Sequence, residues 1–301
     1  MFGVTILGSN SALPVHHRHP TAQIINIEND LLLIDCGEGT QMQINKYKIR
    51  RSKIAHIFIS HLHGDHYFGL PGLLNSMALL GRTAALHLYG PAKLKNIIDT
   101  IFDSADTELP FPLHFHSLEN EGIILEEKNY TVSSFKVMHR IECWGFCIKE
   151  KKKPRKINGD AVHRHSIPTS FFEKLREGKD YVDEKGTIIE NEMITIPNTS
   201  EKSYAYCADT AYTESFLPYI ANANLLYHET TYMKGMEEKA AQRHHSTTLH
   251  ATLIANKASV KMLLIGHFSS QYEDVAPFEK EAKEMFANTQ LAIEGVTFIV
   301  K

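Results

Sequence analysis

Residues 60–66 read SHLHGDH, and this stretch decides the class of fold that the chain can adopt. It places three imidazoles and one carboxylate within six residues. The apolar run Ile54–Ser60 (IAHIFIS) leads directly into it and is typical of a buried strand. Gly64 allows the backbone to turn tightly after that strand, so the side chains of the loop can converge. The stretch therefore predicts a metal-binding loop at a strand end, in preference to a histidine-rich surface loop.

The four polar side chains of this loop divide into two sets. His61 and His63 alternate on one side of the backbone, whereas Asp65 and His66 point elsewhere. The loop can therefore contribute ligands to two metal ions. Zinc and similar divalent ions favour imidazole nitrogen together with some carboxylate oxygen, which makes zinc the expected metal.

Composition sets the outer limits. A chain of 301 residues with 43% hydrophobic content can bury one large core. It has no apolar run long enough to span a bilayer, and its start, MFGVTILGSN, is typical of a first strand rather than a signal peptide. The four cysteines lie in strand-like contexts without CxxC spacing, which favours buried thiols and a cytoplasmic location. The net charge of −3 excludes a generally basic nucleic-acid binder but leaves room for a local basic patch.

The pattern of apolar residues predicts two halves in which strands and helices are mixed. The predicted strands are Phe2–Ser9, Thr21–Glu28, Leu31–Cys36, Ile54–Ser60, Leu86–Tyr89, Tyr204–Cys207, Asn224–His228, Lys261–Gly266 and Leu291–Val300, with a strand meander over Leu113–Glu150. The predicted helices are Thr40–Lys48, Phe68–Leu80, Ala92–Phe102, Thr248–Lys257 and Pro277–Ala287.

The segment between Glu150 and Ser203 has a different character. It opens with a basic run and continues as a polar stretch with weak apolar periodicity. We therefore predict one domain over residues 1–301 with an inserted arm at about 151–202, rather than a second domain. Charge alone favours a solvated loop, but a nucleic-acid substrate would give the run a role in phosphate binding. The candidate RNA-binding residues are Lys151, Lys152, Lys153, Arg155 and Lys156.

The pattern HxHxDH after an apolar strand resembles the metal loop of the metallo-β-lactamase superfamily. That resemblance implies an α/β fold, a four-layer αββα sandwich, and a metal-dependent hydrolase whose substrate the motif leaves open. Further segments narrow the resemblance to the ribonuclease Z family, which removes 3′ trailers from precursor transfer RNA. These segments are GSNSALP (Gly8–Pro14), DCGEGTQMQ (Asp35–Gln43), HLHGDHYFGLPGLL (His61–Leu74), HRIECWGFCIKEK (His139–Lys151), ADTAYTES (Ala208–Ser215), HETT (His228–Thr231), HST (His245–Thr247) and GHFSSQY (Gly266–Tyr272).

The resemblance also implies the remaining metal ligands. His139, Asp209 and His267 each stand at a predicted strand end, where a lone residue of these types is usually structural. In this order after HxHxDH they match the ligands that the superfamily uses, with Asp209 bridging two zinc ions per chain. The implied sets are His61, His63, His139 and Asp209 for metal 1, and Asp65, His66, Asp209 and His267 for metal 2.

The family resemblance implies roles in catalysis for three residues. Asp65 would hold the attacking water or accept its proton, and His245, oriented by Glu229, would protonate the leaving 3′ oxygen. From the residues alone, an ion pair at a helix start with Ser246 and Thr247 as caps explains Glu229 and His245 equally well. The expected products are a 3′ hydroxyl on the transfer RNA and a 5′ phosphate on the trailer.

The arm departs from the family pattern, because KPRKIN (Lys153–Asn158) and IPTSFFEKL (Ile167–Leu175) stand where family members carry a Pro-Gly-Lys-Phe stretch and a Gly-Pro-rich turn. Two other hypotheses also stay open: a hydrolase of small phosphodiesters or other esters on the same fold, and a non-catalytic metal-binding RNA-interaction protein. The resemblance also implies a homodimer that pairs through the helix Phe68–Leu80. We expect that helix to expose Leu70, Leu73, Leu74, Met77 and Leu80.

Overall fold

The structure is a computed structural model that describes residues 2–198 and 200–301. The chain divides into two compact units. The core unit comprises Met1–Glu126, Thr131–Lys149 and Lys202–Lys301, and the arm unit comprises Glu127–Tyr130 and Glu150–Glu201.

The core unit contains two seven-stranded sheets. The strands of the first sheet lie in the order β18 (Thr297–Ile299), β1 (Phe2–Gly8), β2 (Ala22–Ile27), β3 (Asp30–Ile34), β4 (Ile54–Phe58), β5 (Leu86–Gly90) and β6 (Leu113–Ser117). Those of the second lie in the order β17 (Thr289–Leu291), β16 (Leu263–Gly266), β15 (Leu225–Glu229), β14 (Ser203–Cys207), β9 (Trp144–Glu150), β8 (Tyr130–Lys136) and β7 (Gly122–Glu126).

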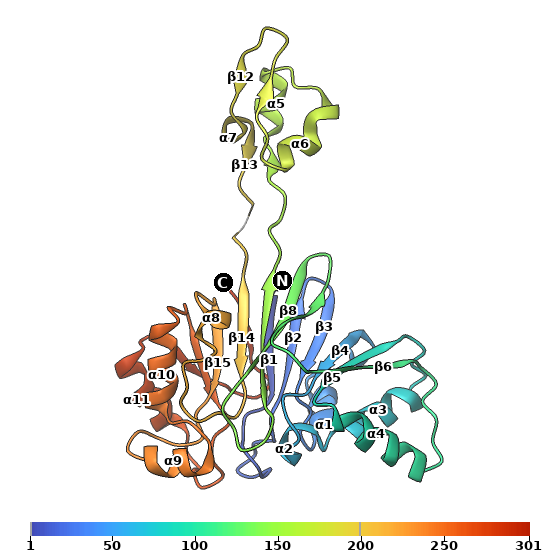
Figure 1. Ribbon diagram of the computed structural model, residues 1–301, viewed down its shortest axis with the longest axis vertical. Coiled ribbons are helices and arrows are strands. Elements are labelled where there is room, and N and C mark those ends of the chain that lie inside the picture. The colour runs from blue at the N-terminus through green and yellow to red at the C-terminus, as the bar shows by residue number, and fades with distance from the viewer. Residues whose placement is uncertain (1, 199) are drawn as a thin grey trace. The chain divides into compact units, whose positions relative to one another are not determined.

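Helices cover the outer face of each sheet (Figure 1). On the first sheet, α1 (Thr40–Lys46), α3 (Leu70–Leu79) and α4 (Lys93–Ser104) share one buried apolar cluster with the strands. On the second, α8 (Leu217–Ile220), α10 (Thr248–Lys257) and α11 (Ala276–Met285) share another. The short helices α2 (Gly64–Tyr67), α9 (Glu237–Arg243) and the 3-10 turn Arg51–Lys53 complete the core unit. The inner faces meet where Phe58 of β4 packs on Phe146 of β9. The predicted four-layer αββα sandwich is therefore confirmed.

Two strand predictions were wrong, because strand pairing depends on distant partners that local apolar patterns do not reveal. Leu291–Val300 is not one strand: β17 pairs with β16 in the second sheet, β18 pairs with β1 in the first, and Gly295 at φ 82° lies between them. The predicted meander over Leu113–Glu150 is also split. Its first strand, β6, runs parallel to β5 in the first sheet, and only β7 to β9 belong to the second.

The helix expected over Phe68–Leu80 begins two residues later, and its apolar residues are distributed differently from the prediction. Four of the five residues predicted to be exposed (Leu70, Leu73, Leu74 and Met77) are core residues with at most 2% exposure. The helix packs on both the sheet and α1, which buries a wider stripe than one core face requires. Leu79 and Leu80, at its end, are exposed apolar residues.

The arm unit consists of short elements around its own small apolar cluster. These are β10 (Lys156–Ile157), α5 (Gly159–Arg164), the 3-10 turn Thr169–Phe171, α6 (Phe172–Arg176), β11 (Tyr181–Val182), β12 (Ile188–Ile189), α7 (Asn191–Ile194) and β13 (Thr195–Ile196). The cluster includes Leu175 and Ile194, which are fully buried. Across residues 2–198 and 200–301, no helix is both long and apolar enough to cross a membrane.

The packing of α10 gives a direct test of the second apolar cluster. Ile254 is fully buried, whereas its neighbour Leu253 is 38% exposed. Ile254→Ala should lower the free energy of unfolding by about 2–5 kcal/mol, because it removes buried methylenes and leaves a cavity. Leu253→Ala on the same helix should cost less than about 1 kcal/mol. Urea unfolding measures both, and equal losses would contradict the assigned faces of α10.

Candidate active site

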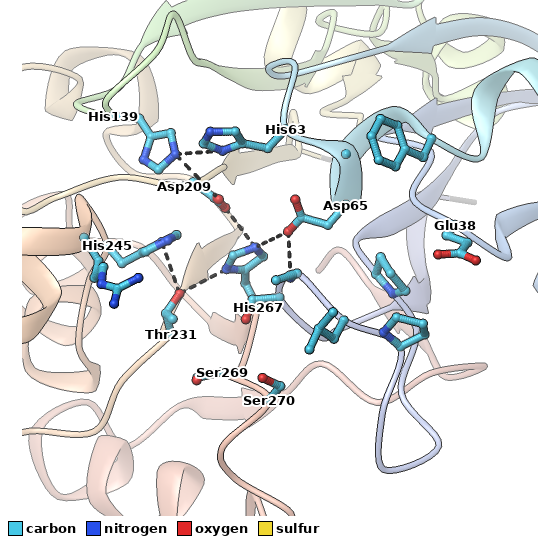
Figure 2. Close-up of a pocket in the computed structure, with 18 of the residues that line it drawn as sticks. Glu38, His63, Asp65, His139, Asp209, Thr231, His245, His267, Ser269 and Ser270 are labelled. Atoms are coloured by element: carbon cyan, nitrogen blue, oxygen red, sulfur yellow. Dashed lines mark hydrogen bonds and ion pairs between the residues drawn. The ribbon is translucent and has the colours of Figure 1, made fainter.

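The site lies at the ends of strands from both sheets. His61, His63 and Asp65 follow β4, Asp209 follows β14, and His267 directly follows β16. All of these except the buried His61 line a pocket of about 630 Å³, together with His139 and His245 (Figure 2). Because β14, β15 and β16 run parallel, their carboxyl ends meet at one edge of the sheet. The fold thus gathers side chains that are more than 200 residues apart in the chain.

The first group of donor atoms is built from three imidazoles. Nδ1 of His63 lies 3.0 Å from Nε2 of His61 and 3.1 Å from Nε2 of His139. Oδ2 of Asp209 lies 3.6 Å from Nε2 of His61 and 4.0 Å from Nε2 of His139. These are the four residues predicted for metal 1, and their donor atoms lie within 4.8 Å of one another.

The second group contains the four residues predicted for metal 2. Oδ1 of Asp209 lies 3.1 Å from Nε2 of His267 and 3.4 Å from Nε2 of His66, and Oδ2 of Asp65 lies 3.5 Å and 3.6 Å from the same two nitrogens. Nε2 of His66, Nε2 of His267 and Oδ1 of Asp209 are buried without a hydrogen-bond partner among the described residues. Buried polar atoms without partners are costly, so a shared cation suits this arrangement.

Two of the rings are oriented for cation binding by hydrogen bonds to the ring nitrogen that faces away from the site. Nδ1 of His66 donates to Oδ2 of Asp35 at 2.7 Å. Nδ1 of His61 lies 3.0 Å from Oγ of Ser60, which itself donates to Asp35. Because the proton of each ring is held at Nδ1, the lone pair of Nε2 faces the site.

Two further rings whose Nε2 faces the site are oriented by acceptors from the second half of the chain. Nδ1 of His139 donates to the backbone carbonyl of His244 at 2.8 Å. Nδ1 of His267 lies 3.0 Å from Oγ1 of Thr231, whose own proton goes to Glu229. The same tautomer therefore follows for both rings.

Asp35 lies within a recognised motif, but the sequence alone assigned it no role. Its carboxylate is fully buried and accepts hydrogen bonds from the backbone and hydroxyl of Ser60, from His66 and from the hydroxyl of Tyr206. Its φ of 56° lies in the left-handed region, which is unusual for a residue other than glycine. Nothing in the segment DCGEGTQMQ indicates that Asp35 adopts this left-handed backbone conformation.

The charges of the site favour a bound cation. Burial lowers the pKa of His61 well below its ordinary value and that of His63 to about 4, so both rings are neutral, as metal binding requires. Burial also acts on His66, but the carboxylates of Asp209, Asp65 and Asp35 outweigh it and raise the pKa of His66 well above its ordinary value. Three carboxylates around one ring leave an excess of negative charge that a divalent ion would offset.

Glu229 and His245 form the predicted pair beside the two donor groups. Nδ1 of His245 donates to Oε1 of Glu229 at 2.9 Å. Although burial lowers the pKa of His245, the carboxylate of Glu229 raises it to about 9. Thr247 caps α10 in a capping box, so the helix-start features that were the alternative explanation are present as well. His245 nevertheless lines the pocket, which a helix-start ion pair does not require.

The predicted RNA-binding residues belong to the arm unit. Lys152 and Lys156 are exposed, and Lys151, Lys153 and Arg155 are half-buried. Arg155 donates through Nε to Oγ1 of Thr195 at 2.6 Å, so it helps to hold the arm unit together. Sequence reasoning missed Arg140, Arg243 and Glu38, which line the pocket of the core unit. They lie in or beside recognised motifs, but charge alone gave no signal to single them out.

The αββα sandwich with two His/Asp donor groups at its strand ends defines a protein of the metallo-β-lactamase fold. Over 301 residues, 99% of both chains, the chain is 39% identical to Ribonuclease Z of Parabacteroides distasonis. It is 43% identical to Ribonuclease Z of Cytophaga hutchinsonii, with 99% of this chain and 96% of that one covered. The crystal structure of human tRNase Z, short form, is similar with a TM-score of 0.72, 24% identity and 99% of both chains covered.

The chain belongs to the ribonuclease Z family. Residues 2–152 also match the family model described as "Anti-Pycsar protein Apyc1", so the N-terminal half falls within that family model as well. That match ends before Asp209, His245 and His267. The Ribonuclease Z relatives match across nearly the whole chain and therefore decide the assignment.

Asp209 is the only residue in both predicted ligand sets, which makes it the sharpest test of them. We expect Asp209→Ala to lose both bound ions, because its two oxygens face the two groups. Metal analysis after dialysis measures the result, with Asp99→Ala, an exposed aspartate on α4, as the control. Two ions retained per chain in Asp209→Ala would contradict the bridging role.

Proposed function

We propose that this protein cleaves precursor transfer RNA at its 3′ side, releasing the trailer with a 5′ phosphate and leaving a 3′ hydroxyl on the transfer RNA. The observation that carries the proposal is the His245–Glu229 pair beside two donor groups, in a chain that matches Ribonuclease Z over its full length. Phosphodiester hydrolysis needs charge neutralisation, a deprotonated nucleophile and a proton for the leaving oxygen. This pocket offers residues for each of these tasks.

The two donor groups are proposed to hold two zinc ions per chain, with His61, His63, His139 and Asp209 in one set and Asp65, His66, Asp209 and His267 in the other. Two such ions would lower the pKa of a water and neutralise the phosphate for in-line displacement. Asp65 is proposed to orient that water and take up its proton. Its Oδ2 accepts from the backbone N–H of Ala12 at 2.8 Å, which holds the carboxylate at the pocket wall.

His245 is proposed as the general acid. Its side chain is only 18% exposed yet carries a proton, because Glu229 lies against Nδ1 and leaves Nε2–H free to face the leaving oxygen. Glu229 itself is fully buried and also accepts from the backbone N–H of Thr210, Thr231 and Ser246. This fixes the carboxylate in one orientation, so Glu229 acts as a positioning residue.

The direct experiment is incubation with a precursor transfer RNA that carries a 3′ trailer, followed by mapping of the cut and of both new ends. A single cut at the 3′ side of the transfer RNA, with a 3′ hydroxyl and a 5′ phosphate at the new ends, supports the proposal. Hydrolysis of bis(p-nitrophenyl) phosphate without any cut in the RNA would favour the small-ester hydrolase instead.

His245→Ala should keep both metal ions but slow single-turnover cleavage by roughly 10²–10⁴-fold, the usual scale for loss of a general acid. Glu229→Gln should shift the alkaline limb of the pH–rate profile to lower pH. The acid form of His245 exists below its pKa, which Glu229 raises, so removing that charge causes the proton to be lost at lower pH. An unchanged rate in His245→Ala would return the residue to a structural role.

The arm unit is proposed to contact the RNA backbone away from the cleaved bond. Its most accessible candidates are Lys152 and Lys156, and Lys152 borders a hollow of about 980 Å³ within the unit. That hollow also has acidic residues on its wall, including Glu173 and Glu190. Contact is therefore expected from the exposed lysines rather than from the hollow as a whole.

Lys152→Gln with Lys156→Gln should weaken binding of precursor transfer RNA and flatten its salt dependence. Removing one lysine–phosphate interaction should reduce the slope of log affinity against log salt by roughly 0.7–0.9. Hydrolysis of bis(p-nitrophenyl) phosphate should stay unchanged, because the residues that line the candidate active-site pocket all belong to the core unit. A parallel fall in both activities would mean that the lysines support the fold instead.

A homodimer that pairs through α3 and the neighbouring α1 is also proposed. Leu79 and Leu80 are 79% and 67% exposed, and Met42 on α1 is 67% exposed. Light scattering at micromolar concentration should show a dimer, and Leu79→Ser with Leu80→Ser should shift it to monomer. Ile101→Ser, at an exposed apolar position of α4, is the control. A monomeric wild-type chain would contradict the proposal.

A further inference from the structure

Phe68 is an exposed aromatic residue on the wall of the candidate active-site pocket. It directly follows α2 and comes three residues after Asp65 in the chain. Its exposed fraction is 64%, whereas that of Tyr232, which also lines the pocket, is 7%. Covering a phenyl ring with another apolar group is favourable. A ring that stays open beside the proposed reacting groups is therefore a place where part of a substrate can bind.

The ring of Phe68 is held in place although it is exposed. A Cβ atom built on Gly64 would lie only 2.2 Å from Cε2 and 2.5 Å from Cδ2 of the ring, so the ring lies directly against the backbone of the metal loop. The ring of Tyr67 packs edge to face with it, with the centroids 5.0 Å apart. Because these contacts already orient the ring, little conformational entropy would be lost when a planar group stacks on it.

Two more apolar residues line the same pocket. Leu13 and Pro14 are both exposed, and Leu13 has an exposed fraction of 54%. Their loop is tied to the metal loop, because the backbone N–H of Ala12 donates to Oδ2 of Asp65 at 2.8 Å. Single exposed apolar residues are common on protein surfaces, whereas a group of them in one pocket indicates a binding surface. This apolar surface adjoins Asp65.

The proposed chemistry determines which nucleotide lies near Phe68. The leaving oxygen is the 3′ oxygen of the last transfer RNA nucleotide, which is proposed to face His245. In an in-line displacement the water attacks from the opposite side of the phosphorus. Figure 2 shows His245 and Asp65 on opposite sides of His267. The transfer RNA therefore extends from the His245 side, and the trailer continues past the phosphate toward the apolar surface beside Asp65.

We propose that Phe68 is the surface on which the base of the first trailer nucleotide stacks, with Leu13 and Pro14 as further apolar contacts. The inference rests on the proposed function, since its partner is the RNA strand that is cut. Every base has a π face, so stacking on an aromatic side chain tolerates any sequence. Phe68 therefore positions the trailer at the cleaved bond without selecting its sequence.

The first test measures the coupling between Phe68 and that base. Affinity is determined for precursor transfer RNA that is unmodified, abasic at the first trailer nucleotide, or abasic at the last transfer RNA nucleotide. The zinc-loaded wild type is compared with Phe68→Ala, Phe68→Tyr and the control Ile101→Ala, an exposed position on α4.

The abasic trailer nucleotide should weaken binding to the wild type roughly 5- to 150-fold, and Phe68→Ala should weaken binding of the unmodified RNA by a similar factor. The two changes together should cost no more than either alone, because they remove the same contact. Phe68→Ala and the abasic transfer RNA nucleotide should instead multiply. Phe68→Tyr and Ile101→Ala should match the wild type. Multiplied losses at the trailer nucleotide, or coupling to the transfer RNA base, would overturn the proposal.

The second test detects stacking directly, with 2-aminopurine as the first trailer base and zinc-loaded His245→Ala protein, in which cleavage is slow. The fluorescence of 2-aminopurine falls when the base stacks, so it should fall on binding. The fall should be lost in His245→Ala with Phe68→Leu, which keeps an apolar side chain but removes the ring. Unchanged fluorescence on binding, or a fall that persists with Phe68→Leu, would contradict the proposal.

Cleavage of the unmodified RNA by the wild type separates this inference from the proposed function. If the wild type cuts the RNA but neither coupling nor the fall in fluorescence is found, only the role of Phe68 is overturned. If the wild type does not cut the RNA, the proposed function fails and the role of Phe68 fails with it.

Discussion

The carboxylate of Asp35 lies between the two sheets, where an ionised group without partners would cost several kcal/mol. Its hydrogen bonds come from Ser60 after β4, from Tyr206 on β14 and from His66 in the metal loop. One buried charge thus connects both sheets to the ring that must face the site. The left-handed backbone of Asp35 lets the chain turn at the end of β3 so that the carboxylate points inward. The positions of the donor groups depend on this contact.

Beyond the contacts of Asp35, the site contains imidazole rings whose protons are fixed in position by hydrogen bonds. Acceptors behind His61, His66, His139 and His267 hold each proton on the side away from the site, so little reorganisation is needed to bind a cation. Thr231 extends the network by joining His267 to Glu229, and Glu229 joins it to His245. A chain of hydrogen bonds therefore connects the proposed general acid with the second donor group. Nε2 of His63, on the outer side of its ring, lies 3.1 Å and 3.0 Å from Nε and Nη2 of Arg140.

The class of fold and the grouping of His61, His63, Asp65, His66, His139, Asp209 and His267 could be predicted because each residue lies just after a strand in a recognisable motif. Residues whose importance depends on tertiary contacts could not be predicted in the same way. Asp35 needed the partner strand β14 to show its role, and Arg140 needed the folded pocket that it lines. The split of Leu291–Val300 between two sheets and the burial of Leu70 and Leu73 likewise follow from distant packing. The two-residue strands of the arm unit are too short for any periodicity.

The central claim is that these buried donors form one dinuclear metal centre bridged by Asp209. X-ray absorption at the zinc K edge of the zinc-loaded protein tests it most directly. The account predicts a shell of nitrogen and oxygen at about 2.0–2.2 Å with imidazole scattering. It also predicts a zinc–zinc vector at roughly 3.5–4 Å. A spectrum with sulfur ligands, or with two bound ions and no zinc–zinc vector, would contradict it.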